Sequence, residues 1–345
     1  MRAVRIAEHG GLDRLRFEDV PDVKPRAGEV RVRLEAIGVN HLDTWVRRGI
    51  PGVTYPLPLT PGCDGAGVVD AVGDGAATRK VGERVVLAPG ISCGVCSACA
   101  HGRDMLCRWY GILGETRDGT CATHVVVPER NALPLPANVT FEVGAAFPLV
   151  YLTAWHMVVD RAALRPGETI LVHAAGSGVS TAAIQIARLL NAGKVLATTS
   201  TPEKAARARG LGADEVIVST KEDVLARVRE ATGKAGVDVV IDHVGMATMG
   251  TSLKCLAKGG RVVSCGATSG PKVEVPMNLV FFKSLSILGS TMGTLGELHE
   301  VLAHVAAGRL KPVVDSVLPL SQVAEAHRRI EAREVFGKIV LKPGA

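Results

Sequence analysis

Four of the eight cysteines lie close together, with the spacing Cys-x2-Cys-x2-Cys-x7-Cys. Clustered thiols in a chain without a secretion signal are more typical of metal ligands than of disulfides. Three closely spaced thiolates and a fourth from the far side of a turn-rich segment can surround zinc at about 2.3 Å. Because protein fills all four positions, such a site is structural; an iron–sulfur cluster is the alternative, although the ferredoxin spacing is missing. The predicted ligands of one zinc ion per chain are Cys93, Cys96, Cys99 and Cys107.

A second chemical motif is a glycine-rich turn in the segment TILVHAAGSGVSTAAIQIARLL, which indicates a strand, a turn and a helix. Backbone N–H groups at the start of such a helix can bind a pyrophosphate, and small residues leave room for it. The glycine pattern alone is a weak signal, because a strict G-x-G-x-x-G would need glycine in place of Thr181. The alternative is therefore a flavodoxin-like or purely structural unit. The predicted coenzyme contacts are Gly176, Ser177, Gly178 and Val179.

The end of the next expected strand bears on which coenzyme this turn would hold. NAD enzymes usually have Asp or Glu there, about 20 residues after the turn, for the ribose hydroxyls. This sequence instead has Thr199, Ser200 and Lys204, which offer hydroxyls and a cation to a 2′-phosphate. We therefore favour NADPH, with NADH as the alternative.

The elements that must position these residues follow two patterns. Up to about residue 130, short Val-rich runs such as EVRVRLEAIGV and GERVVLAP alternate with Gly, Pro and Asp, which is typical of a loop-rich β domain. From about Arg165, apolar strands alternate with amphipathic helices, which predicts a parallel sheet covered by helices on both faces. The predicted fold class is α/β, with one domain at 1–150, completed by 290–345, and a dinucleotide domain at 151–289.

The last part of the sequence predicts three further elements. After Pro276, the stretch MNLVFFKSLSILGST indicates further sheet. The segments GELHEVLAHVAAG and SQVAEAHRRIEA indicate two closing helices that pack back onto the first domain.

Composition and charge exclude several classes of protein. The 345 residues are 47% hydrophobic and 21% charged, which indicates a globular chain rather than a disordered one. No stretch approaches the roughly 20 apolar residues of a membrane span, and no signal-peptide region follows the start. We therefore expect a cytoplasmic protein without membrane partners. The net charge of +6 comes from scattered residues without an aromatic–basic array, which argues against nucleic acid and is compatible with a phosphorylated ligand.

Several segments together resemble the medium-chain dehydrogenase/reductase superfamily over essentially the whole chain: GVNHLD, PGCDGAGVV, the four-cysteine lobe and VHAAGSGVS. AAFPLVYLTAW, VDVVIDHVG, GRVVSCGATSG and FFKSLSILGS are most similar to the quinone oxidoreductase and enoyl reductase branch. The four-cysteine lobe is instead a trait of the zinc alcohol dehydrogenases. The resemblance implies a GroES-like β domain, a doubly wound Rossmann domain, and assembly into a homodimer or homotetramer.

The second, catalytic zinc of the alcohol dehydrogenases has no matching ligand set in this sequence. The positions that match its three ligands are Asn40, Cys63 and Leu149, and one thiol cannot hold an open catalytic zinc. The Ser or Thr that relays the alcohol proton in that family is replaced by Leu42. Both departures argue against alcohol oxidation, where the metal must lower the pKa of the hydroxyl.

These observations predict an enzyme that transfers hydride from NAD(P)H without a metal to a carbon made electrophilic by conjugation. We favour a short or branched 2-enoyl-CoA as the small-molecule acceptor, because of the positive net charge and the small aliphatic character of the chain. The alternatives are a quinone or enone oxidoreductase, a zinc-dependent alcohol dehydrogenase with atypical catalytic ligands, and a non-catalytic NADPH-binding protein.

Two residues are candidates for the catalytic site. Asn40 could donate an amide N–H to the acceptor's carbonyl oxygen, or could cap a turn. Asp64 could hold the strand geometry or relay a proton. Cys63 is interpreted as a small buried thiol rather than a nucleophile. Proton delivery by water is the alternative to a protein donor.

The resemblance also implies further coenzyme contacts. His41 matches a cationic position that contacts coenzyme phosphate in the alcohol dehydrogenases, with a surface histidine as the alternative. The other histidines are interpreted as structural. Arg47, Arg48 and Lys272 are interpreted as solvated charges, or alternatively as contacts for the phosphates of a coenzyme A thioester. The positions that match the nicotinamide surroundings of the family are Thr153, Gly266, Ala267, Leu288 and Ser290.

Overall fold

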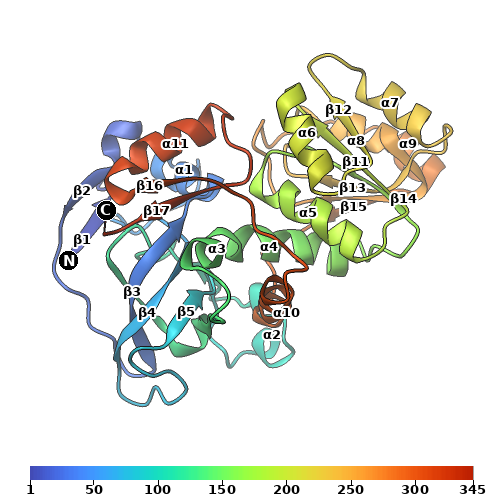
Figure 1. The fold of residues 1–345 in the computed structure, drawn as a ribbon. Helices are drawn as coiled ribbons and strands as arrows, with labels where there is room; N and C mark the ends of the chain where they lie inside the picture. Colours follow the sequence, from blue (N-terminus) through green and yellow to red (C-terminus); the bar gives the residue numbers. More distant parts are fainter. Residues whose placement is uncertain (345) are drawn as a thin grey trace. The chain divides into compact units, whose positions relative to one another are not determined.

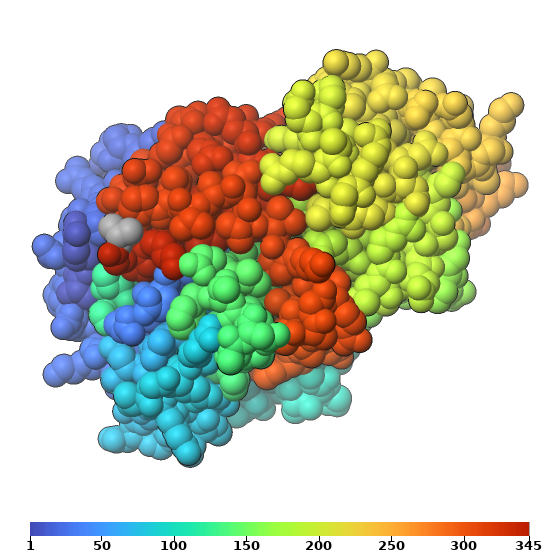
Figure 2. Space-filling model, in the orientation of Figure 1, coloured from blue at the N-terminus to red at the C-terminus, as the bar shows by residue number. Residues whose placement is uncertain are grey.

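The computed structural model describes residues 1–344, which form two compact units (Figure 1). The first unit contains Met1–Leu149, Thr294–Ala307 and the chain from Pro312 onward. The second unit contains Val150–Gly293 and Gly308–Lys311. In Figure 2 the red residues near the C-terminus lie against blue and green residues of the first unit, so both ends of the chain build that unit.

The first unit is built on a seven-stranded sheet in the order β16-β17-β3-β4-β5-β9, with β8 also paired to β3. The pairs are antiparallel except for β16 and β17, which run parallel. Two small antiparallel pairs join β1 to β2 and β6 to β7. The strands of the large sheet are β3 (Glu29–Gly38), β4 (Asp64–Val72), β5 (Arg84–Leu87), β8 (His124–Pro128), β9 (Ala132–Pro134), β16 (Val314–Pro319) and β17 (Lys338–Lys342). Those of the small pairs are β1 (Arg2–Arg5), β2 (Arg16–Asp19), β6 (Gly90–Ile91) and β7 (Gly111–Ile112).

Strand β3 shows why the Val-rich runs form this sheet. Val30, Val32 and Leu34 alternate with Arg31 and Arg33, and alternation places the apolar side chains on one face of a strand. The three apolar side chains are at most 4% exposed and belong to the main core of the unit. The predicted β character of the first part of the chain is therefore confirmed.

The helices of the first unit lie against the sheet or at its connections, and α3 (Phe141–Ala146) contacts the neighbouring strands β17, β3, β4 and β5. Helix α10 begins at a capping box: Thr294 accepts from the Glu297 N–H over 3.1 Å, and the Glu297 carboxylate accepts from the Thr294 N–H over 2.7 Å. Helices α10 and α11 are the two closing helices that the sequence predicts. The α-helices are α1 (His41–Arg48), α2 (Ser97–Ala100), α3 (Phe141–Ala146), α10 (Leu295–Ala306) and α11 (Val323–Glu331). The 3-10 helices are η1 (Leu12–Arg14), η2 (Asp104–Leu106), η3 (Glu129–Asn131) and η5 (Leu320–Gln322).

The second unit is a six-stranded parallel sheet in the order β12-β11-β10-β13-β14-β15. Numbered from β10, this order is 3-2-1-4-5-6, the doubly wound arrangement of dinucleotide-binding domains. The observed sheet confirms the predicted α/β class. The strands are β10 (Thr169–Val172), β11 (Lys194–Thr199), β12 (Glu215–Val218), β13 (Val237–Asp242), β14 (Leu256–Ser264) and β15 (Ser286–Gly289).

Helices connect the strands of this sheet, and Figure 1 shows α5 and α6 on its near side. None of the helices within residues 1–344 is both long and apolar enough to cross a lipid bilayer. The helices are α4 (Pro148–Trp155), which begins at the end of the first unit, the π-helical segment η4 (His156–Arg161), α5 (Gly178–Leu189), α6 (Pro202–Gly210), α7 (Val224–Ala231), α8 (Met249–Cys255) and α9 (Met277–Lys283).

The prediction of sheet across MNLVFFKSLSILGST is wrong for its first half. Met277–Lys283 is helix α9, and the strand β15 begins only at Ser286. Pro276 directly precedes the first helical residue, and Leu279 and Val280 pack against the core of the unit. A short apolar run is compatible with a strand or a helix, and packing against the sheet decides between them.

Candidate functional site

Asn40 lies where strand β3 has ended and helix α1 begins. Its backbone N–H donates to the Asp43 carboxylate over 2.7 Å, and its carbonyl oxygen accepts from the Asp43 N–H over 3.1 Å. This reciprocal contact fixes the start of α1. The backbone of Asn40 therefore caps the helix while its side chain makes other contacts.

The Asn40 side chain is the centre of a buried polar cluster. Its Nδ2 donates to Asp64 Oδ2 over 2.9 Å and approaches Cys63 Sγ to 3.2 Å. Its Oδ1 accepts from the Lys338 ammonium, which also donates to Asp64 Oδ2 over 3.0 Å. The other Asp64 oxygen accepts from the Leu149 N–H over 2.9 Å. Asn40, Asp64 and Lys338 are 4%, 0% and 3% exposed, so the cluster is shielded from bulk solvent.

Burial controls the protonation of two side chains next to Asn40. It raises the pKa of the Asp43 carboxyl to about 7, and it raises the pKa of the Cys63 thiol well above its usual range. Cys63 is therefore a protonated thiol at neutral pH.

Lys338 is the functional candidate that the sequence did not reveal. Strand β17 pairs antiparallel with β3, with Val340 opposite Gly38 and Leu341 opposite Ile37. Continued by two residues, this register brings Lys338 beside Asn40. The signal is a long-range strand pairing, and no local pattern around Lys338 indicates it.

The four clustered cysteines come together in one lobe, between β6 and β7 and around the short helices α2 and η2. Their sulfur atoms all lie within 4.8 Å of one another, with Cys93 and Cys99 at 3.9 Å and Cys96 and Cys99 at 3.6 Å. Sulfurs at about 2.3 Å from a tetrahedral zinc are about 3.8 Å apart, so this donor set fits the metal. Backbone N–H groups of Val95 and Cys96 help to lower the pKa of the Cys93 thiol to about 6, which favours the thiolate.

The glycine-rich turn connects β10 to the twelve-residue helix α5. Ser177 caps the helix: its hydroxyl accepts from the Ser180 N–H over 3.0 Å. The N–H groups of Gly178 and Val179 open the helix and cannot have an intrahelical acceptor. The turn therefore presents backbone donors and a helix N-terminus, which fit the pyrophosphate of a dinucleotide.

His243 lies beside this turn, and no sequence pattern indicates that contact. Its Nε2 is 2.9 Å from the hydroxyl oxygens of both Ser177 and Ser180. The turn follows β10 and His243 follows β13, and these two strands are neighbours where the strand order reverses. Ligands of doubly wound sheets bind at this switch point, so His243 joins the candidate coenzyme residues.

A buried hydrogen-bond chain holds the loop that carries His243. Burial lowers the pKa of His173, so its ring is neutral at neutral pH. The Ser252 hydroxyl donates to Asp242 Oδ2 over 2.7 Å, so the His173 Nε2–H donates to Ser252 Oγ over 3.0 Å. The His173 Nδ1 then accepts from the Thr198 hydroxyl over 3.1 Å. Asp242 Oδ1 accepts from two backbone N–H groups of the loop after β13, at 2.8 and 3.1 Å, which fixes that loop.

The residues predicted to choose the coenzyme lie at the end of β11. Thr199 is the last residue of the strand and is 4% exposed, whereas Ser200 is exposed. Lys204 lies on the first turn of α6, where its backbone N–H donates to Thr201 Oγ1 over 3.3 Å. Glu203 lies on the same turn. The Glu203 backbone N–H and the Thr201 side chain lower the pKa of the Glu203 carboxyl, and the charge of Lys221 lowers it further.

The remaining predicted coenzyme residues come from several elements. The loops after β14 and β15 are joined, because the Ser290 N–H donates to Ser264 O over 2.8 Å and Ser264 Oγ donates to Gly266 O over 3.1 Å. Ala267 follows β14, and Leu288 lies in β15. Both residues are near the carboxyl ends of the parallel strands, where the glycine-rich turn after β10 also lies. Thr153 lies in α4 and is 5% exposed, and His41 is the exposed first residue of α1.

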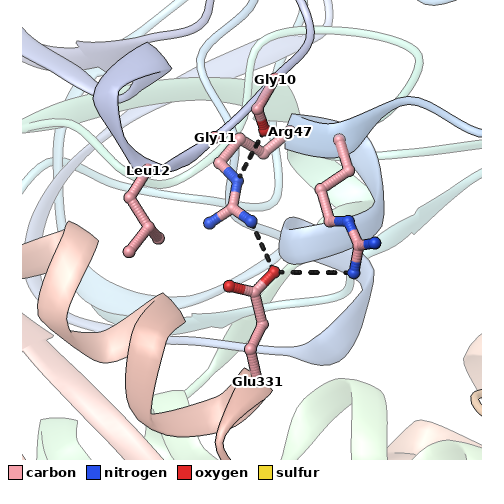
Figure 3. A pocket seen from close by; sticks show the side chains of 6 residues that line it. Gly10, Gly11, Leu12, Arg47 and Glu331 are labelled. Atoms are coloured by element: carbon pink, nitrogen blue, oxygen red, sulfur yellow. Dashed lines mark hydrogen bonds and ion pairs between the residues drawn. The ribbon is translucent and has the colours of Figure 1, made fainter.

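The interpretation of Arg47 as a solvated charge is wrong. Arg47 is 2% exposed, and its guanidinium forms an ion pair with Glu331 of α11 and donates to Gly10 O over 3.3 Å (Figure 3). A cavity of about 460 Å³ lies beside it. Arg48, at the end of the same helix, is exposed as predicted, with a side chain 64% exposed and 3.9 Å from the Glu331 carboxylate.

Two family models match the chain. Residues 26–137 match the alcohol dehydrogenase GroES-like domain, and residues 178–307 match the zinc-binding dehydrogenase family. Among curated proteins, the quinone oxidoreductase of Pseudomonas aeruginosa is 35% identical over 99% of this chain and 99% of its own length.

Two solved structures share the whole fold. One, described as an NAD-dependent alcohol dehydrogenase, is 50% identical with a TM-score of 0.96 and covers 99% of both chains. The other is the Escherichia coli quinone oxidoreductase complexed with NADPH, which is 31% identical with a TM-score of 0.85 and covers 99% of this chain and 100% of its own. The match extends over both units in each case.

Proposed function

Because the chain belongs to the quinone oxidoreductase-like branch of the medium-chain dehydrogenase/reductase superfamily, and is thus an NAD(P)H-dependent oxidoreductase, we propose that it reduces an activated C=C bond without a catalytic metal. The acceptor we favour is a short or branched 2-enoyl-CoA. When bound, the coenzyme supplies a hydride from its nicotinamide. The protein has to bind both reactants, exclude water and stabilise the negative charge that develops on the acceptor.

The observation that carries this proposal is the donor set around Asn40. The positions that match the ligands of a catalytic zinc hold an amide, a single buried thiol, and the apolar Leu149. The Lys338 ammonium is hydrogen-bonded to two groups of the same cluster. A divalent cation needs several anionic or lone-pair donors and is repelled by a neighbouring ammonium. An acceptor reduced here should therefore be activated by its own conjugation.

NADPH is the coenzyme we propose. The end of β11 offers the Thr199 and Ser200 hydroxyls, followed by Lys204. A ribose-binding carboxylate at that strand end would favour NADH, and neither residue is acidic. The Escherichia coli relative is described as complexed with NADPH, which supports this choice. The relative described as NAD-dependent supports the NADH alternative.

A single structural zinc ion in the four-cysteine lobe completes the proposed cofactors. The sulfur separations of 3.6 and 3.9 Å support it, as does the filling of all four positions by protein. In this site the metal would organise the loop-rich segment between β6 and β7 and would take no part in the reaction.

Two kinds of observation bear on the acceptor. The exposed cations Arg48 and Lys272 suit a substrate that carries phosphates, as a coenzyme A thioester does. The names of the curated relatives support a quinone or enone instead. Both acceptors present a carbonyl oxygen conjugated to the carbon that receives the hydride.

The test is NADPH oxidation measured over a panel of 2-enoyl-CoAs, quinones and enones, together with the zinc content per chain. We expect turnover with one of these classes, one zinc per chain, and hydride transfer that survives mild chelation. Oxidation of simple alcohols by a protein that holds two zinc ions per chain would overturn the proposal.

A second candidate is an NAD-dependent alcohol dehydrogenase. The 50% identity to a structure described in those words favours it. The two candidates separate in the same experiment, because the alcohol dehydrogenase should reduce NAD⁺ with a primary or secondary alcohol and should lose that activity with its catalytic metal.

We also propose that two copies associate through strand β15, the open edge of the parallel sheet. Ile287 of this strand is 44% exposed, and Phe281 and Phe282 of α9, the helix that precedes β15 in the chain, are 62% and 73% exposed. A free strand edge flanked by exposed large apolar side chains is an unstable surface for a monomer and a suitable one for strand pairing.

A further inference from the structure

Lys338 is a buried ammonium whose hydrogen bonds are incomplete. Its side chain is 3% exposed, and an ammonium has three N–H donors. Two of them are used, by Asn40 Oδ1 and by Asp64 Oδ2. Within residues 1–344 the third has no protein acceptor. A buried donor without an acceptor is costly, so the site is built to receive one more oxygen.

The ammonium also lies among the residues that match a metal site. Asn40, which accepts from Lys338, approaches Cys63 Sγ to 3.2 Å through its amide nitrogen. Asp64, the other partner of Lys338, accepts from the backbone N–H of Leu149. Each of the three matching positions is thus either a direct partner of Lys338 or one contact away from it.

Asn40 itself has little capacity left to hold an acceptor. An amide nitrogen has two N–H donors, and those of Asn40 are directed at Asp64 Oδ2 and Cys63 Sγ. Its oxygen is taken by Lys338. Asn40 and Asp64 therefore hold the ammonium in place, and the donor that remains in the cluster belongs to Lys338.

We propose that the Lys338 ammonium replaces the catalytic metal as the fixed positive charge of the site, and that its third N–H donates to the carbonyl oxygen of the acceptor. This inference rests on the proposed function, because it concerns the same reaction. It makes Lys338 a catalytic residue and Asn40 a positioning residue.

The chemistry balances with the reactants already named. Hydride addition to the β-carbon forms one C–H bond and moves the C=C electron pair toward the acceptor's oxygen, while the nicotinamide is oxidised. The ammonium keeps its protons and stabilises that oxygen by charge and one hydrogen bond. A proton from water at the α-carbon then restores the carbonyl group and completes the reduction.

The experiment compares the wild type with one variant that buries no net charge. Lys338→Met alone would leave the Asp64 carboxylate buried and unpaired, and Asp64→Asn alone would leave the Lys338 ammonium in the same state, so each single change threatens folding. The test is therefore the double variant, Lys338→Met with Asp64→Asn. For the wild type and the double variant, the rate of hydride transfer is measured in a single turnover at saturating acceptor, together with the dissociation constant of NADPH and the melting temperature.

We expect the double variant to transfer hydride about 100-fold more slowly than the wild type, with NADPH affinity and melting temperature little changed. Equal hydride-transfer rates in the two proteins would overturn the inference. Lys342→Met is the matched control: Lys342 lies on the same strand and forms an ion pair with Glu142, outside the cluster, so its loss should leave the rate unchanged.

The failure of this inference can be told apart from the failure of the proposed function. If the wild-type protein oxidises NADPH with none of the conjugated acceptors, the proposed function is wrong. If the wild type is active and the double variant transfers hydride equally fast, only the role of Lys338 is wrong.

Discussion

The Asp43 carboxyl is a buried acid that connects the candidate site to pH. Its pKa is about 7 in the folded protein, against an ordinary value of 3.8, and burial is the main cause. The folded state therefore binds the proton more tightly than the unfolded state does. The free energy of unfolding should fall as the pH rises from about 4 to about 7, by on the order of 4 kcal/mol, and level off above that range.

Asp43→Asn removes this titration while keeping an oxygen for the Asn40 N–H. The wild-type protein should therefore lose stability relative to this variant as the pH rises from about 4 to about 7. Urea unfolding at a series of pH values measures the difference, and Asp74→Asn, at an exposed acid, serves as the control. Parallel curves for the wild type and Asp43→Asn would contradict the prediction.

His243 should act through the coenzyme rather than through stability. His243→Leu removes the contacts between the imidazole and the Ser177 and Ser180 hydroxyls, both at 2.9 Å, beside the start of α5. We expect the dissociation constant of NADPH to rise about tenfold, because the turn that meets the pyrophosphate loses its lateral support. Fluorescence titration measures it. His299→Leu, at an exposed position of α10, is the control, and equal affinities in the two variants would speak against a coenzyme role for His243.

Individual residues were predictable where their role is local. The four cysteines and the glycine-rich turn carry their own spacing, and the structure places the members of each group together. Lys338 was not predictable, because only the pairing of β17 with β3 brings it to Asn40. The burial of Arg47 depends in the same way on Glu331 of α11, which is far away in the sequence.

At the scale of elements, periodicity predicted most strands and the two closing helices. In these elements the apolar pattern repeats often enough along the sequence to be recognised. It failed at α9, where a seven-residue apolar run is equally compatible with both structures. Helix α8 was not predicted at all. It is seven residues long, and its position depends on the Asp242 carboxylate, which accepts from Ser252 of this helix over 2.7 Å.

The four-cysteine lobe should be an element that depends on its metal. Cys107 is buried, but the other three cysteines are half-exposed, and the lobe has few apolar side chains in the core of its unit. Cys99→Ser should therefore lose the zinc and lower the melting temperature by about 10 °C, measured by calorimetry and metal analysis. Cys265→Ser, at a cysteine outside the cluster, should keep the zinc. A Cys99→Ser protein with unchanged melting temperature would show that the metal is not structural.

The end of β11 should determine the choice between the two coenzymes. Ser200→Asp places a carboxylate where the 2′-phosphate of NADPH would lie. The carboxylate repels that phosphate, whereas it can accept a hydrogen bond from the ribose hydroxyl of NADH. We expect kcat/KM for NADPH to fall at least about tenfold while that for NADH stays equal or rises, which steady-state kinetics with both coenzymes will measure. Thr220→Asp, at a neighbouring residue whose hydroxyl donates to Ser200 O over 2.8 Å, tests whether any added charge has this effect. The same change in both variants would contradict the assignment.

The whole molecule combines a mainly antiparallel unit and a parallel-sheet unit, each with its own hydrophobic core. The two edge strands of the parallel sheet differ in character. At one edge, Glu215 of β12 forms ion pairs with Lys194 of β11 and Arg227 of α7. At the other, Ile287 of β15 is 44% exposed, and Phe281 and Phe282 of α9, the helix that precedes β15 in the chain, are exposed as well. Charge protects a free edge from pairing, whereas large apolar side chains promote it, so association should use β15.

Ile287→Lys should therefore break the association of two chains. A lysine on the edge strand adds a charge that must be desolvated in each copy, at a position where the wild-type isoleucine is 44% exposed. We expect the dissociation constant of the dimer to rise at least about 100-fold, measured by analytical ultracentrifugation over a range of concentrations. Val81→Lys adds the same charge at a residue that is 66% exposed in the other unit, and it should leave the dimer intact. A dimer that survives Ile287→Lys unchanged would place the contact elsewhere on the surface.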